Sequence, residues 1–102
     1  MLRCNMNTET PSLQLQLDDL LGDLQHCRRR GDMGRLALLS YCEVRRWARQ
    51  AGEQALAERS FEMIVRSPHA NREAFMAQVD VLIGELEQAR GRTAATPQAI
   101  RA

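Results

Sequence analysis

The chain contains a small set of side chains that bind metals in other proteins, two histidines and three cysteines. Imidazole and thiolate are common zinc ligands, so a zinc site would recruit His26, Cys27, Cys42 and His69. The spacing does not favour such a site, because His26 and Cys27 are adjacent and adjacent helical residues point about 100° apart. No Cys-x-x-Cys pair occurs. We therefore expect no metal and no other cofactor.

The same residue types could support nucleophilic catalysis, which needs a Cys or Ser next to a His, an orienting acid and backbone donors for an oxyanion. The sequence has no Gly-x-Ser-x-Gly motif and no glycine-rich phosphate loop. Asp18 and Asp19 are adjacent carboxylates, an arrangement typical of a solvated helix face. We expect that the protein is not an enzyme.

Arginine supplies every basic side chain, and it is clustered in residues 28–30 with Arg35 and in residues 45–49. Such clusters could contact phosphates. The formal net charge is only +1, which does not give the positive field typical of nucleic-acid-binding domains. An antiparallel hairpin would also place the two clusters at opposite ends. Nucleic-acid binding through residues 28–35 is therefore an alternative that we do not favour.

Trp47 lies between arginines, and Trp and Arg contribute much of the binding energy at protein interfaces. Two interpretations stay open. Trp47 could anchor a partner, or it could close the core beside Val44 and Ala51 with its indole N–H reaching a helix end.

Length and composition indicate which elements must position these residues. A chain of 102 residues with 44% hydrophobic and 26% charged residues has room for one folded domain. No segment alternates with the period of a strand, so we expect an all-α fold. We predict a flexible leader over residues 1–9, a helical domain over 10–91 and a flexible tail over 92–102.

Caps and apolar spacing predict the helices. The first begins at 10–12 and ends at Gly31, with an apolar ridge of Leu13, Leu17, Leu20, Leu24 and Cys27. Asp32 caps a second helix from Met33 to about Gln50, apolar on nearly every face between residues 36 and 44. Gly52 ends it, or bends one longer helix.

A third helix is predicted over residues 53–66, with Ala57, Phe61, Ile64 and Val65 on one face. Ser67-Pro68 marks a boundary. The last helix begins near Ser67 or Asn71 and ends at Gly91, with a second ridge of Phe75, Val79, Leu82, Leu86 and Ala89.

These elements predict a small antiparallel bundle of three to four helices. The chain has few aromatic residues to fill a core, so we expect one ridge to be completed by a second copy in a homodimer. We expect a regulatory or adaptor protein that binds another protein, such as a transcription regulator whose dimerisation it blocks. The predicted partner-binding residues are Leu36, Leu39, Tyr41, Arg45 and Trp47.

The location and the alternatives follow from the same features. The chain has no signal-peptide opening and no apolar run of the roughly 20 residues that cross a bilayer. We therefore expect a cytoplasmic protein without membrane contact. A client-binding chaperone of the secretion type is a further alternative.

Overall fold

The computed structural model describes residues 12–101, with side chains described as far as residue 92. The elements in this part of the chain are α2 (Leu13–Arg30), α3 (Met33–Leu38), the π-helical turn η1 (Leu39–Glu43), α4 (Val44–Ala51), α5 (Gln54–Val65) and α6 (Arg72–Arg101). No strand occurs among them, and the predicted all-α class is confirmed. The predicted leader, residues 1–9, and Cys4 lie outside the described residues.

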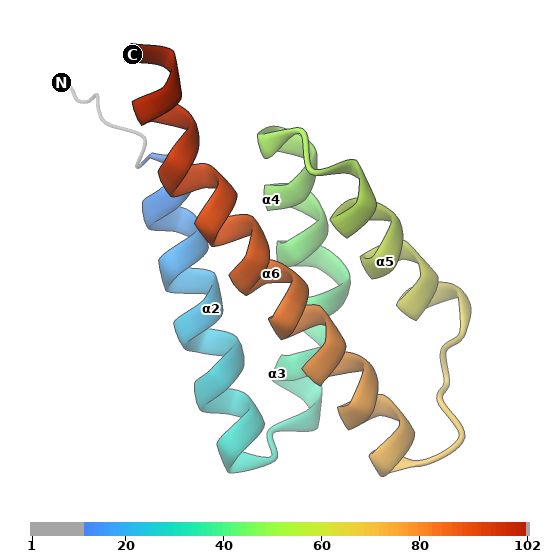
Figure 1. Ribbon diagram of the computed structural model, residues 1–102. Coiled ribbons are helices and arrows are strands. Elements are labelled where there is room, and N and C mark those ends of the chain that lie inside the picture. Colours follow the sequence, from blue (N-terminus) through green and yellow to red (C-terminus); the bar gives the residue numbers. More distant parts are fainter. Residues whose placement is uncertain (1–11, 102) are drawn as a thin grey trace, which may run out of the picture.

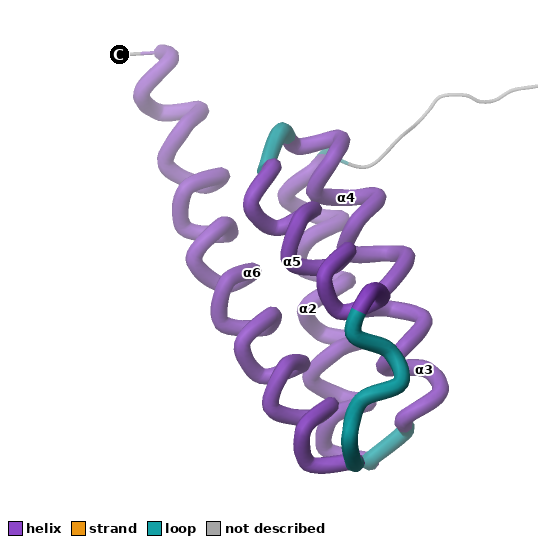
Figure 2. Tube along the Cα trace, turned by 90° about the vertical axis from the view of Figure 1, so that its right-hand side faces the viewer, coloured by secondary structure: helices purple, strands orange, loops and turns teal. Residues whose placement is uncertain are grey.

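The described helices form an antiparallel bundle (Figure 1). Because α3, η1 and α4 join without a break, we treat them as one rod, the α3–α4 rod, and the bundle has four rods: α2, α3–α4, α5 and α6. Successive rods reverse direction, so α2 and α5 run one way while α3–α4 and α6 run the other. In Figure 2, α6 lies along one side of the bundle, and its last turns extend past the connection between α4 and α5. The bundle predicted from the sequence is therefore present.

The helix ends follow local rules. The Ser12 side chain accepts a hydrogen bond from Leu15 N, and the Asp32 side chain accepts one from Arg35 N. Gly31 and Gly52 end their helices with positive φ, 71° and 75°, a conformation that costs other residues about 1 kcal/mol or more. Asn71 caps α6 through Ala74 N. These ends agree with the predicted ones.

The two apolar ridges belong to one core within a single chain. Leu17, Leu20, Leu24 and Cys27 of α2 are buried, as are all five predicted residues of the α6 ridge. Polar pairs flank this contact along its length: Arg28 with Asp80, Gln25 with Glu87, and Arg90 with Asp18. Burial of these ridges therefore needs no second copy, and the homodimer stays a prediction.

The predicted end of the last helix at Gly91 is wrong, because α6 continues to Arg101. Gly91 stays helical, which costs only about 1 kcal/mol relative to Ala. The next residue is held by an ion pair between Arg92 and Glu53, 2.7 Å long. The helix therefore continues through the local stop signal, and this tertiary contact lies directly after it. The mobility predicted for residues 92–102 stays a prediction.

The face of α5 that packs against the core also differs from the apolar face that the sequence predicted. Leu56, Ser60 and Met63 are buried, whereas Phe61 is 49% exposed and Val65 is 64% exposed. The apolar face predicted from the sequence is therefore partly left on the surface. Within the described residues, no helix is both long enough and apolar enough to cross a membrane.

Candidate partner-binding surface

The five predicted partner-binding residues point in three directions from one continuous helix. Leu36 is fully buried in the core. Leu39 and Trp47 are buried on the side that faces α2. Tyr41 and Arg45 are partly exposed on the opposite side, next to α5. The structure therefore brings together only Tyr41 and Arg45 on an accessible surface.

Trp47 closes the core, as one of its two interpretations proposed. It is 3% exposed, and its Nε1–H donates a 2.8 Å hydrogen bond to the carbonyl oxygen of Leu13, the first residue of α2. Buried Trp normally needs such a partner for its N–H. This hydrogen bond links the start of α2 to the middle of α4.

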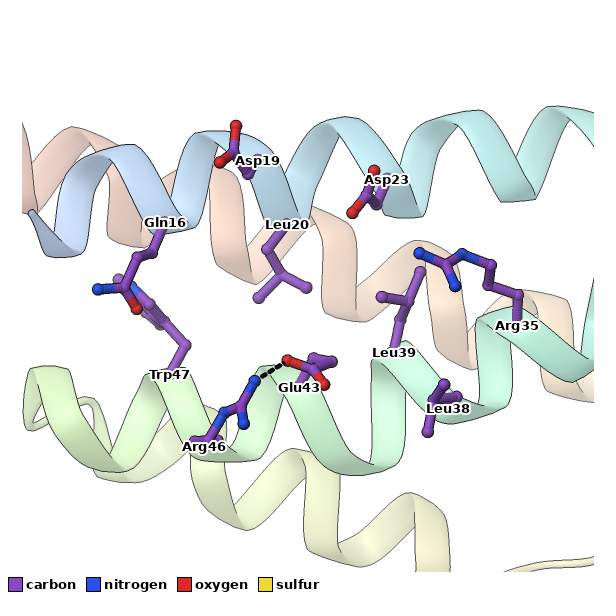
Figure 3. A pocket seen from close by; sticks show the side chains of 10 residues that line it. All are labelled: Gln16, Asp19, Leu20, Asp23, Arg35, Leu38, Leu39, Glu43, Arg46 and Trp47. Carbon is purple, nitrogen blue, oxygen red and sulfur yellow. Dashed lines mark hydrogen bonds and ion pairs between the residues drawn. The ribbon is translucent and has the colours of Figure 1, made fainter. Parts of the chain in front are cut away.

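A pocket of about 350 Å³ lies between α2 and the α3–α4 rod (Figure 3). Its apolar base includes Leu20, Leu39 and Trp47. Its charged groups have mixed signs: Asp19 and Asp23 lie along α2, and Arg35 reaches across from α3 (Figure 3). An ion pair between Arg46 and Glu43 lies at its edge. This mixture gives no preference for an anion or a cation.

A second depression runs between α4 and α5, and we name it the α4–α5 groove. It consists of two adjoining hollows of about 470 and 350 Å³ that share Arg45 and Arg49. The lining side chains are Tyr41, Cys42, Arg45, Arg46, Arg49, Gln50, Gln54, Ala57, Glu58, Phe61 and Ile64. The α5 side of the groove is apolar at Ala57, Phe61 and Ile64 and polar at Gln54 and Glu58, and α4 contributes a row of arginines.

The arginines of this groove differ from those that stabilise the fold. The guanidinium of Arg45 lies 5.4 Å from the centre of the Phe61 ring, a cation–π contact. Among the described residues, neither Arg45 nor Arg49 has an acidic partner within ion-pair distance. These two charges are available to an external acid.

Arg59 shows the contrasting case on the other side of α5. Its guanidinium makes a two-pronged contact with the carboxylate of Glu85, with a shortest distance of 2.8 Å. The side-chain hydrogen bonds and the charge of Glu85 raise the pKa of Arg59 above its ordinary value. Hydrogen bonds from Arg28 to Asp80 and from Arg92 to Glu53 raise the pKa of those arginines similarly. Such arginines connect α6 to its neighbours.

In the arginine cluster of residues 28–30 and Arg35, only Arg28 pairs with a described carboxylate of α6. Arg28 contacts Asp80, while Arg29, Arg30 and Arg35 are exposed. This cluster lies where α2 meets α3, and the α4–α5 groove begins further along the rod. The structure thus keeps the two basic regions separate, as the hairpin argument predicted.

The residues considered as metal ligands do not come together. Cys27 is buried, Cys42 is exposed and His26 is exposed. In the described part of the chain, no three His, Cys, Asp or Glu residues are grouped so that they could hold a metal ion.

Phe61, Ile64 and Arg49 are surface residues that the predicted set omitted. The apolar stripe on α5 was visible in the sequence, but the sequence did not show that it faces outward beside α4. Comparison with protein-family models, curated proteins and solved structures found no match to this chain.

Proposed function

We propose that this chain is an adaptor or regulatory protein that binds another protein in the α4–α5 groove. The observation that carries the proposal is the half-exposed ring of Phe61 beside Arg45 and Arg49, two charges without an acidic partner in the described chain. Aromatic and arginine side chains that lie together are typical of the energetic centres of interfaces.

The proposed occupant is an acidic amphipathic helix. A groove between two helices accepts a third helix through apolar side chains spaced three or four residues apart. Ile64 and Phe61 offer the apolar contacts, and the arginines of α4 would pair with Asp or Glu on the flank of the incoming helix. Opposite charge thereby selects the partner, while apolar burial supplies most of the affinity.

The proposed mode of action is sequestration in the cytoplasm. A transcription regulator that dimerises through an acidic helix would be held as an inactive monomer while that helix occupies the groove. The support for this step is analogy of size and all-helical architecture. A homodimer is the competing use of the same surface, since the core ridges are already covered within one chain.

The test uses charge reversal together with site-specific crosslinking. Gln50 is exposed and lines the groove, so a photo-crosslinking amino acid at position 50 reports what lies there. Full-length protein carrying this label is irradiated in cells that express the chain naturally, and the attached peptide is sequenced. The proposal requires an acidic helical segment of another protein, with crosslinking lost in the double variant Arg45→Glu/Arg49→Glu.

Arg29→Glu/Arg30→Glu is the matched control, because it reverses the same number of charges outside the groove. Circular dichroism verifies that both variants stay folded. Crosslinking that survives Arg45→Glu/Arg49→Glu contradicts the proposal, and so does a crosslink to a second copy of this chain. Duplex DNA binding that falls steeply with salt and is lost in the control variant would instead support the nucleic-acid alternative.

A further inference from the structure

A third hollow, of about 460 Å³, lies at the other end of the bundle, between α3, residues 67–71 and the first turn of α6. We name it the His69 pocket. Met33, Ala37 and Pro68 contribute to its apolar wall. Its volume falls within the range of about 300–1,000 Å³ that is typical of small-molecule sites.

Aromatic contacts give this pocket a fixed shape. The Phe75 ring is 5% exposed and lies between two other rings. Its centre is 6.3 Å from Tyr41 in an edge-on arrangement and 5.3 Å from His69 in a tilted one. Because these rings come from three different segments, the pocket is part of the folded bundle and does not need to be assembled by a ligand.

Two polar groups of the pocket, on His69 and Arg72, have no hydrogen-bond or ion-pair partner within the described chain. Nε2 of His69 is buried and makes no hydrogen bond there. A buried polar group without a partner costs about 1–3 kcal/mol, so a ligand that pairs with it gains binding energy. Arg72 lines the same pocket and has no ion pair among the described residues.

The end of the Arg72 side chain lies close to the backbone of Gly31. A Cβ atom at position 31 would lie only 2.5 Å from Nη2 of Arg72, so the missing side chain allows the guanidinium to rest against the turn between α2 and α3. This turn adjoins Met33 and Gly34, which line the pocket. Among the described residues, none of those that line the pocket is acidic. Its charge is therefore positive and its walls are apolar.

We propose that the His69 pocket binds a small organic anion, a carboxylate attached to a flat apolar body. The apolar body would lie against Phe75 and Met33, and the carboxylate would accept hydrogen bonds from Arg72 and from Nε2–H of His69. This proposal does not rest on the proposed function. Tyr41 is the residue that the His69 pocket shares with the α4–α5 groove.

The test is an NMR titration of the full chain with 3-phenylpropionate, alongside its neutral amide and acetate. The expected result is saturable shifts of the Met33 methyl group, Ala37 and the Phe75 ring. The carboxylate should bind about tenfold more tightly than the amide, the factor expected for one charge-assisted hydrogen bond. Acetate, which has no apolar body, should not saturate the site below tens of millimolar.

Two variants separate the anion contact from simple apolar binding. Arg72→Gln and His69→Leu should each remove most of the preference for carboxylate over amide, while Arg66→Gln, an exposed arginine outside the pocket, should leave it unchanged. The proposal is overturned by equal affinity for carboxylate and amide, by shifts confined to exposed arginines, or by no saturable shift at all. Failure here leaves the groove proposal intact, because its own test uses a different face.

Discussion

The Ser60 hydroxyl donates a 2.5 Å hydrogen bond to the backbone carbonyl oxygen of Ser40, at a site where both side chains are fully buried. Ser40 lies in the π-helical turn η1. In an α-helix the Ser40 carbonyl would accept from Val44 N–H, but that donor bonds to Leu39 O instead. Ser60 therefore donates a hydrogen bond to a buried carbonyl within the irregular turn, and this bond links α5 to η1.

We predict that Ser60→Ala lowers the free energy of unfolding by about 2 kcal/mol, because it leaves the Ser40 carbonyl buried with one donor fewer. Urea denaturation followed by circular dichroism measures the change. Ser67→Ala is the control, since Ser67 is exposed in the segment before α6 and should change stability by less than about 0.5 kcal/mol. Equal values for the two variants would show that the Ser60 hydrogen bond contributes nothing.

The bond from Trp47 to Leu13 gives a second prediction. Trp47→Phe keeps an aromatic ring but removes the donor, so the free energy of unfolding should fall by about 2 kcal/mol from lost packing and a lost hydrogen bond. Hydrogen exchange should accelerate in the first turn of α2. Leu15→Ala, a change in the same turn at a side chain 57% exposed, is the control. Unchanged exchange in Trp47→Phe would contradict the role assigned to the indole N–H.

Local sequence rules predicted most helix ends because a cap depends on a few neighbouring residues. Ser12, Asp32 and Asn71 accept hydrogen bonds from the backbone at helix starts, and Gly31 and Gly52 reach positive φ without a Cβ. Repeated apolar spacing likewise predicted the ridges of α2 and α6, because three- and four-residue steps place side chains on one face of any helix.

The rotation of α5 could not be found in the same way. Its most apolar face includes Phe61 and Val65, yet the core takes the face with Ser60. In this orientation Ser60 bonds to the Ser40 carbonyl and Arg59 pairs with Glu85, and both partners lie on other helices. The candidate groove exists because of this rotation. Sequence spacing indicated an apolar stripe, but only the tertiary contacts show that it lies on the surface beside Arg45.

The contact between Arg59 and Glu85 should help to keep α5 in the orientation in which Ser60 faces the core. We predict a coupling of about 0.5–1 kcal/mol in a double-mutant cycle with Arg59→Ala and Glu85→Ala, because the pair is two-pronged and only about one-third exposed. The cycle on Arg46 and Glu43, a more exposed pair within one rod, should give about 0.3–0.5 kcal/mol.

Salt dependence provides a further check on that pair. Raising the ionic strength to 1 M shortens the screening length to about 3 Å, so the exposed Arg46–Glu43 coupling should fall more than the Arg59–Glu85 coupling. If both cycles give zero at low salt, then Ser60 and the apolar contacts of Leu56 and Met63 alone set the orientation of α5.

Glycine substitutions should have opposite signs at two positions. Gly22 lies inside α2 on an exposed face, and an added Cβ there would meet no described atom outside its own helix within 4 Å. Gly22→Ala should therefore raise the free energy of unfolding by about 0.5–1 kcal/mol, because Ala loses less backbone entropy in a helix. Gly52 also has open space around it, but its φ is 75°, so Gly52→Ala should lower the same quantity by about 1 kcal/mol.

Thermal unfolding of both variants measures the difference, and the pair isolates backbone conformation because neither substitution creates a clash. A rise in melting temperature for Gly52→Ala equal to that for Gly22→Ala would mean that α4 does not end in a left-handed residue at position 52, and the geometry of the connection that aligns α4 with α5 would then be wrong.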